Sequence, residues 1–300
     1  MNYKKIIKNK SLRLKIINMF NFIPDKPIIR LQYRIKTGRK LNLKNPKRYT
    51  EKLQWYKLYY RHPLLTQCSD KYAVRQYLNK KGYEGILNEL YGVYNSVDEI
   101  NFDSLPHKFA IKVNNSSGTN IFINDKSLMD ESAVRKQLKN WMERAKGSYG
   151  REWCYHNIKP KITIEKLIDR DSNNDLPDYK FFCFNGKVFC LYTMIDYIDD
   201  HSKGKLGFYD LAFNKIEVRR TDYSEILEKL EKPRNFEKMI EIAEDLSKEF
   251  PHVRVDFYNI DGKIIFGEFT FYNASGYTSF EPDDFDFIMG EKFILPNIIS

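Results

Sequence analysis

The chain has 300 residues, of which 42% are hydrophobic and 15% aromatic, and it carries a formal net charge of +10. This length and apolar content are enough for a folded core, so the composition excludes a disordered protein. No apolar run approaches the ~20 residues that a membrane helix needs, and the N-terminus lacks a small-residue cleavage site, which argues against a membrane span and a signal peptide.

The N-terminal segment is the most basic part of the chain. Residues 1–50 contain 15 Lys and Arg against a single acid, Asp25, which leaves a small negative charge on the remaining chain. Within 1–45, apolar residues alternate with lysines, and this pattern predicts a basic helical arm that faces an anionic membrane or nucleic acid. Two interpretations stay open: the arm lies on a bilayer surface, or it packs on the body with its lysines in solvent.

Residues 46–107 predict a helical region that contributes to substrate binding. The stretch "NPKRYTEKLQWYKLYY" predicts a helix with Thr50 as its N-cap. The stretch "DKYAVRQYLNKK" predicts a second helix, which Ser69 caps and Gly82 ends.

Residues 108–170 and 171–300 predict two lobes that contain antiparallel sheets. The first holds a strand–loop–strand unit, a helix that begins after Asp130, and the strand "KITIEKLI". The second holds a hairpin around Asn185-Gly186, an amphipathic helix over 235–250 and a final hairpin over 253–270. The predicted class is therefore α+β.

The final hairpin, "VRVDFYNIDGKIIFGEFT", carries acids within apolar strands. We predict a three-residue turn over 260–262, which places Asn259 opposite Lys263, Asp256 opposite Phe266 and Arg254 opposite Glu268. Arg254, Asp256, Glu268 and Thr270 then share one face. A two-residue turn would instead put the two acids on opposite faces. Two carboxylates on one face need a compensating charge, and both Arg254 and a divalent cation such as Mg²⁺ are open possibilities.

Six stretches in order carry a resemblance to a known family. They are "NPKRYTEKLQWYKLY", "DKYAVRQYL", "LPHKFAIKVNNSSGTNI", "YGREWCYHNIKPKITIEKLI", "LPDYKFFCFNGK" and "FPHVRVDFYNIDGKIIFGEFTFY". Together they resemble the TupA-like ATP-grasp proteins of bacterial surface-polysaccharide gene clusters, from about residue 25 to the C-terminus. The resemblance implies an ATP-grasp fold, in which two α+β lobes clamp ATP with Mg²⁺ on its phosphates.

The resemblance also implies roles for individual residues. Asp256, Glu268 and Thr270 would bind the metal, and Arg254 and Lys180 would act in catalysis. The cofactor-binding residues would be Arg75, Lys112, Ser116, Ser117, Gly118, Glu165 and Asp178. Taken from the residues alone, Lys112, Lys180, Arg75 and Glu165 also have an interpretation as ordinary surface charges. The sequence departs from the wider superfamily in two places: "NNSSGTN" has only Gly118, and Thr270 stands where an Asn ligand is common.

The implied activity is ATP-dependent ligation of a carboxylate to an amine through an acyl phosphate. We expect the carboxylate to belong to a uronic acid of a surface polysaccharide or its lipid-linked precursor, and the amine to be a small amine or amino acid. The implied location is the cytoplasm, at the inner membrane face if the arm binds lipid. A glycosyltransferase or kinase of the same pathway remains an alternative, and a non-catalytic nucleic-acid binder is the weakest one. The four cysteines form no C-x-x-C pair, so we predict reduced core thiols.

Overall fold

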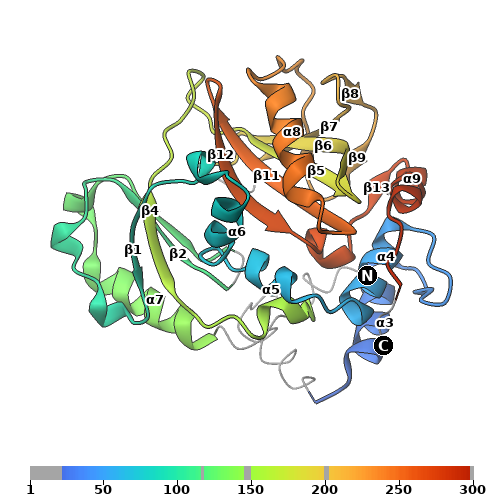
Figure 1. The fold of residues 1–300 in the computed structure, drawn as a ribbon, viewed down its shortest axis with the longest axis horizontal. Coiled ribbons are helices and arrows are strands. Elements are labelled where there is room, and N and C mark those ends of the chain that lie inside the picture. Colours follow the sequence, from blue (N-terminus) through green and yellow to red (C-terminus); the bar gives the residue numbers. More distant parts are fainter. Residues whose placement is uncertain (1–21, 116–117, 145–149, 199–202, 298–300) are drawn as a thin grey trace.

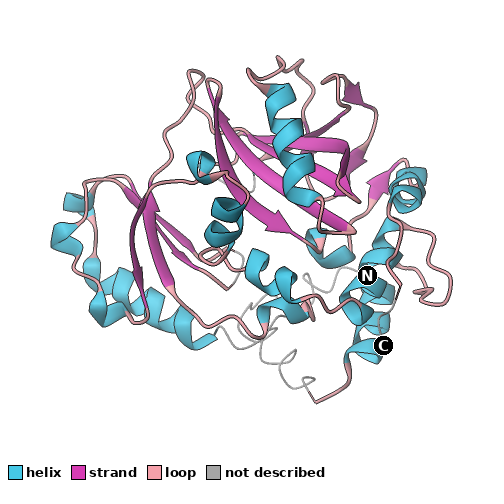
Figure 2. Cartoon of the chain, in the orientation of Figure 1, coloured by secondary structure: helices cyan, strands magenta, loops and turns pink. Residues whose placement is uncertain are grey.

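The computed structural model describes residues 22–115, 118–144, 150–198 and 203–297. These residues form two sheets, each covered by helices, which stand side by side in Figure 1 and Figure 2. All strand pairs of the two sheets are antiparallel except the parallel pair of β10 (Ser224–Glu225) and β7 (Lys205–Tyr209). The α+β class is therefore confirmed. Within the described residues, no helix combines the length and the apolar character needed to cross a bilayer.

The smaller sheet has four strands in the order β1-β4-β2-β3. The strands are β1 (Leu90–Tyr94), β2 (Phe109–Val113), β3 (Asn120–Ile123) and β4 (Ile162–Lys166). Helix α7 (Glu131–Arg144) packs Val134 and Leu138 into the same apolar cluster as Ile111, Ile162 and Ile164 of this sheet. Asp130 accepts a hydrogen bond from the Ala133 amide, which confirms it as the cap of α7. Strand β1 belongs to this sheet, although it lies in the segment 46–107 that we assigned to a separate region.

The larger sheet has seven strands, with six in the order β10-β7-β6-β5-β11-β12 and β8 paired to β7. Its strands are β5 (Asp178–Phe184), β6 (Lys187–Ile195), β7 (Lys205–Tyr209), β8 (Lys215–Ile216), β10 (Ser224–Glu225), β11 (His252–Ile260) and β12 (Lys263–Thr270). Helix α8 (Phe236–Ser247) lies across it and buries Phe236, Met239, Ala243 and Leu246, as its periodicity predicts. Strands β9 (Arg219–Arg220) and β13 (Phe280–Glu281) form a separate pair.

The other helices surround these sheets. They are α3 (Asp25–Thr37), α4 (Tyr49–Tyr59), α5 (Pro63–Ser69), α6 (Val74–Lys80) and α9 (Asp284–Lys292). Seven-residue helices α5 and α6 lie between the two sheets in Figure 1, and the Lys71 amide donates to the carbonyl of Asn114 just after β2. Short 3-10 turns occupy Glu84–Ile86, Val97–Glu99, Phe102–Ser104, Lys126–Leu128, Trp153–Tyr155 and Asn273–Gly276.

The basic arm is described only in part. Helix α3 packs on the body, because Ile29 and Tyr33 are fully buried against Leu41 and Leu43. The apolar and basic residues of 1–21 lie outside the described residues. One face of the segment 25–37 therefore packs on the body, and the opposite face, which includes Leu31 and Ile35, is exposed.

Two predicted helix caps are wrong. Helix α4 begins at Tyr49 after Arg48, where Glu51 accepts the Arg48 amide, and Thr50 lies inside it. Thr50 instead donates its amide and hydroxyl to Asp286 of α9. At the second helix, Asp70 rather than Ser69 accepts the Tyr72 and Ala73 amides. Gly82, with φ +80°, ends that helix as predicted.

Candidate active site

The β11–β12 hairpin differs from the prediction at its turn. Ile260 pairs with Lys263, so the turn has two residues, Asp261 and Gly262, both with positive φ. Continued regularly, this register would put Asp256 and Glu268 on opposite faces. The strands avoid that outcome through a bulge at Gly267, which lies between Phe266, the partner of Phe257, and Glu268, the partner of Asp256.

Because of the bulge, the predicted partners of Asp256 and Arg254 are wrong, but the predicted set of residues on one face is right. Asp256 pairs with Glu268 and Arg254 with Thr270, so these four residues do share a face. Between the turn and the bulge the predicted faces are wrong: Phe266 pairs with Phe257 on the opposite face, and Ile265 pairs with Tyr258.

A row of four polar residues crosses the larger sheet. Tyr192 on β6 pairs with Lys180 on β5, Lys180 pairs with Asp256 on β11, and Asp256 pairs with Glu268 on β12. A second bulge, at Phe189, brings Tyr192 into this row, because Phe182 pairs with Cys190 and Cys183 with Val188. Adjacent strands are ~4.8 Å apart, so the row extends ~14 Å from Tyr192 to Glu268.

Arg254 and Asp256 form the buried centre of the site. Asp256 is 1% exposed and accepts Arg254 Nε at 2.7 Å and Nη2 at 2.6 Å. The remaining Arg254 hydrogen bonds go to the Tyr192 hydroxyl at 2.9 Å, to Asn273 Oδ1 and to the Thr270 hydroxyl at 2.9 Å. A guanidinium has five N–H donors, and all five are engaged here.

Lys180 joins two carboxylates beneath the cleft. Its Nζ lies 2.8 Å from Asp256 Oδ2 and forms an ion pair with Asp178 Oδ2. Burial lowers the pKa of Lys180, but the two carboxylates outweigh it and hold that pKa above its ordinary value. Burial also raises the pKa of Asp178, to about 6, against the opposing charge of Lys180. For Asp256, burial is overcome by Arg254 and Lys180, so its pKa is lowered.

A cavity of about 390 Å³ lies above this row. Of the predicted site residues, it is lined by Asp178, Lys180, Arg254, Glu268 and Thr270. Its other lining residues include Ser69, Lys71, Glu152, Tyr155, Tyr192, Tyr197, Arg220, Tyr223, Tyr272, Asn273 and Ser275. The structure thus gathers one set of predicted residues, together with the buried Asp256, around one cleft.

The other predicted residues form a second cluster. Lys112 Nζ lies 2.7 Å from Glu165 Oε2, and Arg75 Nη1 lies 3.8 Å from Glu165 Oε1. Lys71 connects the two clusters: burial lowers its pKa, and Glu268, Lys112 and Glu165 are all among the charges that act on it. Ser116 and Ser117 lie outside the described residues, and Gly118 has φ +72° with open space around it.

The donor set fits a divalent metal that arrives with a phosphate ligand. Within the described residues, no three His, Cys, Asp or Glu side chains are grouped as a metal site. Mg²⁺ is commonly held by one or two carboxylates plus substrate phosphates, and Glu268, whose side chain is 45% exposed, faces the cleft. Asp256 already accepts hydrogen bonds from Arg254 and Lys180, so metal ligation through Asp256 would replace one of them.

Asp178 Oδ1 is buried and has no hydrogen-bond partner within the described part of the chain.

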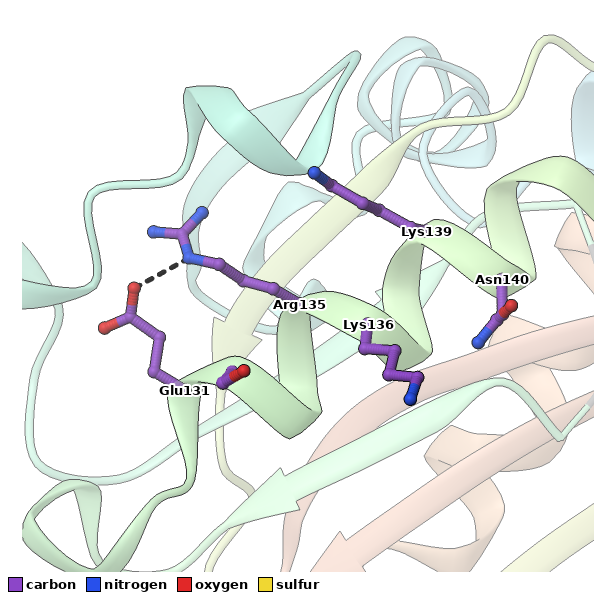
Figure 3. A pocket seen from close by; sticks show the side chains of 6 residues that line it. Glu131, Arg135, Lys136, Lys139 and Asn140 are labelled. Atoms are coloured by element: carbon purple, nitrogen blue, oxygen red, sulfur yellow. Dashed lines mark hydrogen bonds and ion pairs between the residues drawn. The ribbon is translucent and has the colours of Figure 1, made fainter.

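A further hollow of about 630 Å³ lies on the exposed side of α7. Figure 3 shows Glu131 paired to Arg135, with Lys136, Lys139 and Asn140 farther along the helix. None of the predicted site residues lines it. We interpret it as a solvated helix face.

The cleft residues that the sequence analysis missed include Lys71, Tyr192, Arg220 and Asn273. Lys71 stands in the stretch "DKYAVRQYL", four residues before Arg75, so this stretch was a usable signal. Tyr192 reaches the site only through the bulge at Phe189, and no local pattern marks Arg220 or Asn273.

Comparison with known proteins identifies the family. The family model "TupA-like ATPgrasp" matches residues 51–294, which is most of the chain. The chain belongs to the TupA-like ATP-grasp family. The ATP-grasp fold expected from the sequence is confirmed, and enzymes of this class are ligases that use ATP and Mg²⁺. Among curated proteins, none matches the chain.

Solved ATP-grasp structures are similar at low identity. The D-alanine–D-alanine ligase of Bacillus anthracis with ATP matches at 16% identity and a TM-score of 0.43, over 69% of this chain and 56% of the ligase. N5-carboxyaminoimidazole ribonucleotide synthetase with ADP matches at 14% and 0.41, over 74% and 50%. The Helicobacter pylori D-alanine–D-alanine ligase matches at 12% and 0.39, over 76% and 61%. The chain thus spans less than two thirds of the length of these structures.

Proposed function

We propose that this ATP-grasp protein is an ATP- and Mg²⁺-dependent carboxylate–amine ligase. Its acceptor would be a uronic acid of a bacterial surface polysaccharide or of the lipid-linked precursor, and its second substrate a small amine or amino acid. The observation that carries the proposal is the pair Asp256–Glu268, aligned across β11 and β12 beside a cavity and inside the residues that the family model matches.

The proposed reaction has two steps. A carboxylate oxygen of the acceptor attacks the γ-phosphorus of ATP, the bond to the β-phosphate oxygen breaks, and ADP leaves. An amine nitrogen then attacks the acyl carbon, the carbon–oxygen bond to phosphate breaks, and the nitrogen gives up one proton to solvent. Phosphorylation is needed because a free carboxylate is a poor electrophile.

The residues of the site would divide these tasks. Glu268, with Asp256 and the Thr270 hydroxyl, would hold the metal, which neutralises charge on the transferring phosphoryl group. Lys112 and Arg75 would contact the nucleotide phosphates. Both already form ion pairs with the carboxylate of Glu165, so their charged groups are placed to bind an oxyanion there. Lys180 and Arg254 would hold Asp256 in place and supply positive charge.

The test uses hydroxylamine in place of the unknown amine. With ATP, Mg²⁺ and glucuronate whose carboxylate carries a heavy-oxygen label, a ligase forms a hydroxamate and transfers label to the released phosphate. A kinase would make ADP without hydroxamate, and a glycosyltransferase would leave ATP intact. Either of those results would refute the ligase.

We also propose a peripheral position on an anionic membrane, through α3. Leu31 and Ile35 are 55% and 47% exposed one helical turn apart, and Arg30 and Arg34 beside them are exposed as well. Replacing Leu31 and Ile35 by Glu should reduce binding to vesicles that contain phosphatidylserine, and added salt should reduce wild-type binding. Equal binding of variant and wild type would contradict this location.

A further inference from the structure

Arg254 and Arg220 both line the cleft, and they differ in how many of their N–H donors are engaged by the protein. All five N–H donors of Arg254 are engaged by Asp256, Tyr192, Asn273 and Thr270. Arg254 therefore cannot bind a further oxyanion without losing a protein partner. Arg220 also lines the cleft and is 6% exposed.

Arg220 keeps donor capacity. Its Nε and Nη2 donate to Asp222 at 3.0 and 2.7 Å, and its Nη1 donates to the Tyr192 hydroxyl at 3.4 Å. Three of its five N–H groups are therefore engaged by described residues, which leaves one N–H on each terminal nitrogen. Its guanidinium stacks over the ring of Tyr223, with 4.9 Å between its carbon and the ring centre.

The Tyr192 hydroxyl lies between the two arginines. It accepts Arg254 Nη1 at 2.9 Å and Arg220 Nη1 at 3.4 Å, which occupies both of its lone pairs. No described residue accepts its proton, although Tyr192 is only 2% exposed and lines the cleft. A buried hydroxyl of this kind requires an acceptor, which a ligand oxygen would supply.

The pair lies in the cleft beside the proposed metal residues, whereas Lys112 and Glu165 are not among the residues that line it. The backbones of Tyr192 and Glu268 are ~14 Å apart, but their side chains approach each other through Arg254. The Tyr192 hydroxyl accepts Arg254 Nη1 at 2.9 Å, and Arg254 Nη2 lies 3.7 Å from Glu268 Oε1. Lys71 interacts electrostatically with Glu268, Lys112 and Glu165, so the charges proposed to bind phosphate approach the cleft from the β12 side. The β6 side is therefore left for the acceptor, next to a phosphate held near Glu268.

We propose that Arg220 and Tyr192 bind the carboxylate of the proposed uronic acid acceptor. This inference rests on the proposed function. Two spare N–H groups and one O–H match the oxygens of a carboxylate. Asp178 Oδ1, which has no described partner, would accept a ring hydroxyl, and Tyr223 and Tyr197 line the same cleft.

The experiment measures glucuronate binding to the full chain by ligand-observed NMR, with glucose as the uncharged analogue. Glucuronate should bind at least about tenfold more tightly than glucose, and Arg220→Gln should weaken it by about tenfold or more. Arg220→Lys keeps the charge without the fork and should fall between the two. The matched control is Arg219→Gln, because Arg219 is 55% exposed and pairs with Glu281 outside the cleft.

Stabilisation by Mg-ADP is measured in parallel on the same variants. It should be unchanged in Arg220→Gln, which also shows that this variant folds. Equal glucuronate affinity of Arg220→Gln and wild type would overturn the inference, as would equal affinity of glucuronate and glucose. Absence of glucuronate binding in a wild type that Mg-ADP stabilises would overturn the inference while leaving the nucleotide site of the proposed function standing.

Discussion

Asp256 and Glu268 lie directly opposite each other across the β11–β12 hairpin, although the two-residue turn between their strands would place them on opposite faces. The residue that reconciles the two facts is Gly267, which is bulged out of the pairing. The proposed metal site therefore depends on Gly267, a single glycine without a partner on β11.

Gly267→Ala should weaken Mg-ADP binding and lower stability by about 1 kcal/mol or more. A Cβ at this position would lie 3.0 Å from the carbonyl oxygen of Asp256, so that backbone would have to move. The measurement is the Mg-ADP dissociation constant by calorimetry, together with the urea midpoint. Gly85→Ala is the control, because a Cβ there meets nothing within 4 Å, and equal behaviour of the two variants would contradict the role of the bulge.

Arg254→Gln should lower the free energy of unfolding by about 3–5 kcal/mol, the usual cost of removing one partner from a buried ion pair. Arg254 and Asp256 are both nearly inaccessible, and the loss would leave Asp256 with Lys180 alone. Urea unfolding at neutral pH measures the change. Arg219→Gln breaks an exposed pair and should cost less than about 1 kcal/mol. Similar values for the two variants would show that the buried network contributes little.

Lys112→Met should weaken ADP binding by about tenfold or more and leave adenosine binding nearly unchanged. The reason is that Lys112 would exchange its bond to Glu165, 2.7 Å away, for a nucleotide phosphate. Calorimetric titration with ADP and with adenosine separates the loss of a phosphate contact from a general loss of the fold. Equal weakening of ADP and adenosine would argue against a phosphate contact.

His252→Gln should flatten the acid limb of the stability profile. His252 is fully buried between the Tyr49 hydroxyl and the Cys183 carbonyl, and burial lowers its pKa from 6.5 to about 3. Between these values the unfolded chain binds a proton that the folded chain does not, so stability falls as pH drops from 6.5 toward 3. One such group contributes up to ~1.4 kcal/mol per pH unit. Urea unfolding across this range should give a shallower slope for the variant, and identical slopes would refute the assignment.

Strong local signals predicted much of the fold. The Asn185-Gly186 turn, with φ of +49° and +77°, and the amphipathic α8 follow from residues close together in the chain. All four cysteines are buried and free, as predicted for reduced core thiols. The cap of α4 was predicted wrongly because Thr50 bonds to Asp286, a residue far away in sequence.

The composition of the cleft was harder to predict, because it depends on bulges. A bulge reverses which side chains share a face, and nothing in "GKVFCLY" or "IIFGEF" shows which residue is extra. Asp256 and Glu268 were grouped correctly although the turn was predicted wrongly, since the bulge offset the error. Tyr192 was not predicted, because its place in the cleft depends on the bulge at Phe189.

Thermal unfolding with and without Mg-ADP, in wild type, Asp256→Asn and Glu268→Gln, tests the metal-dependent nucleotide site most directly. Saturating Mg-ADP should raise the wild-type midpoint by roughly 5 °C, since a ligand at a hundred times its Kd adds ~2.7 kcal/mol. Both variants should lose most of that shift, and ADP without Mg²⁺ should stabilise wild type less. Full stabilisation of both variants by Mg-ADP would contradict the site.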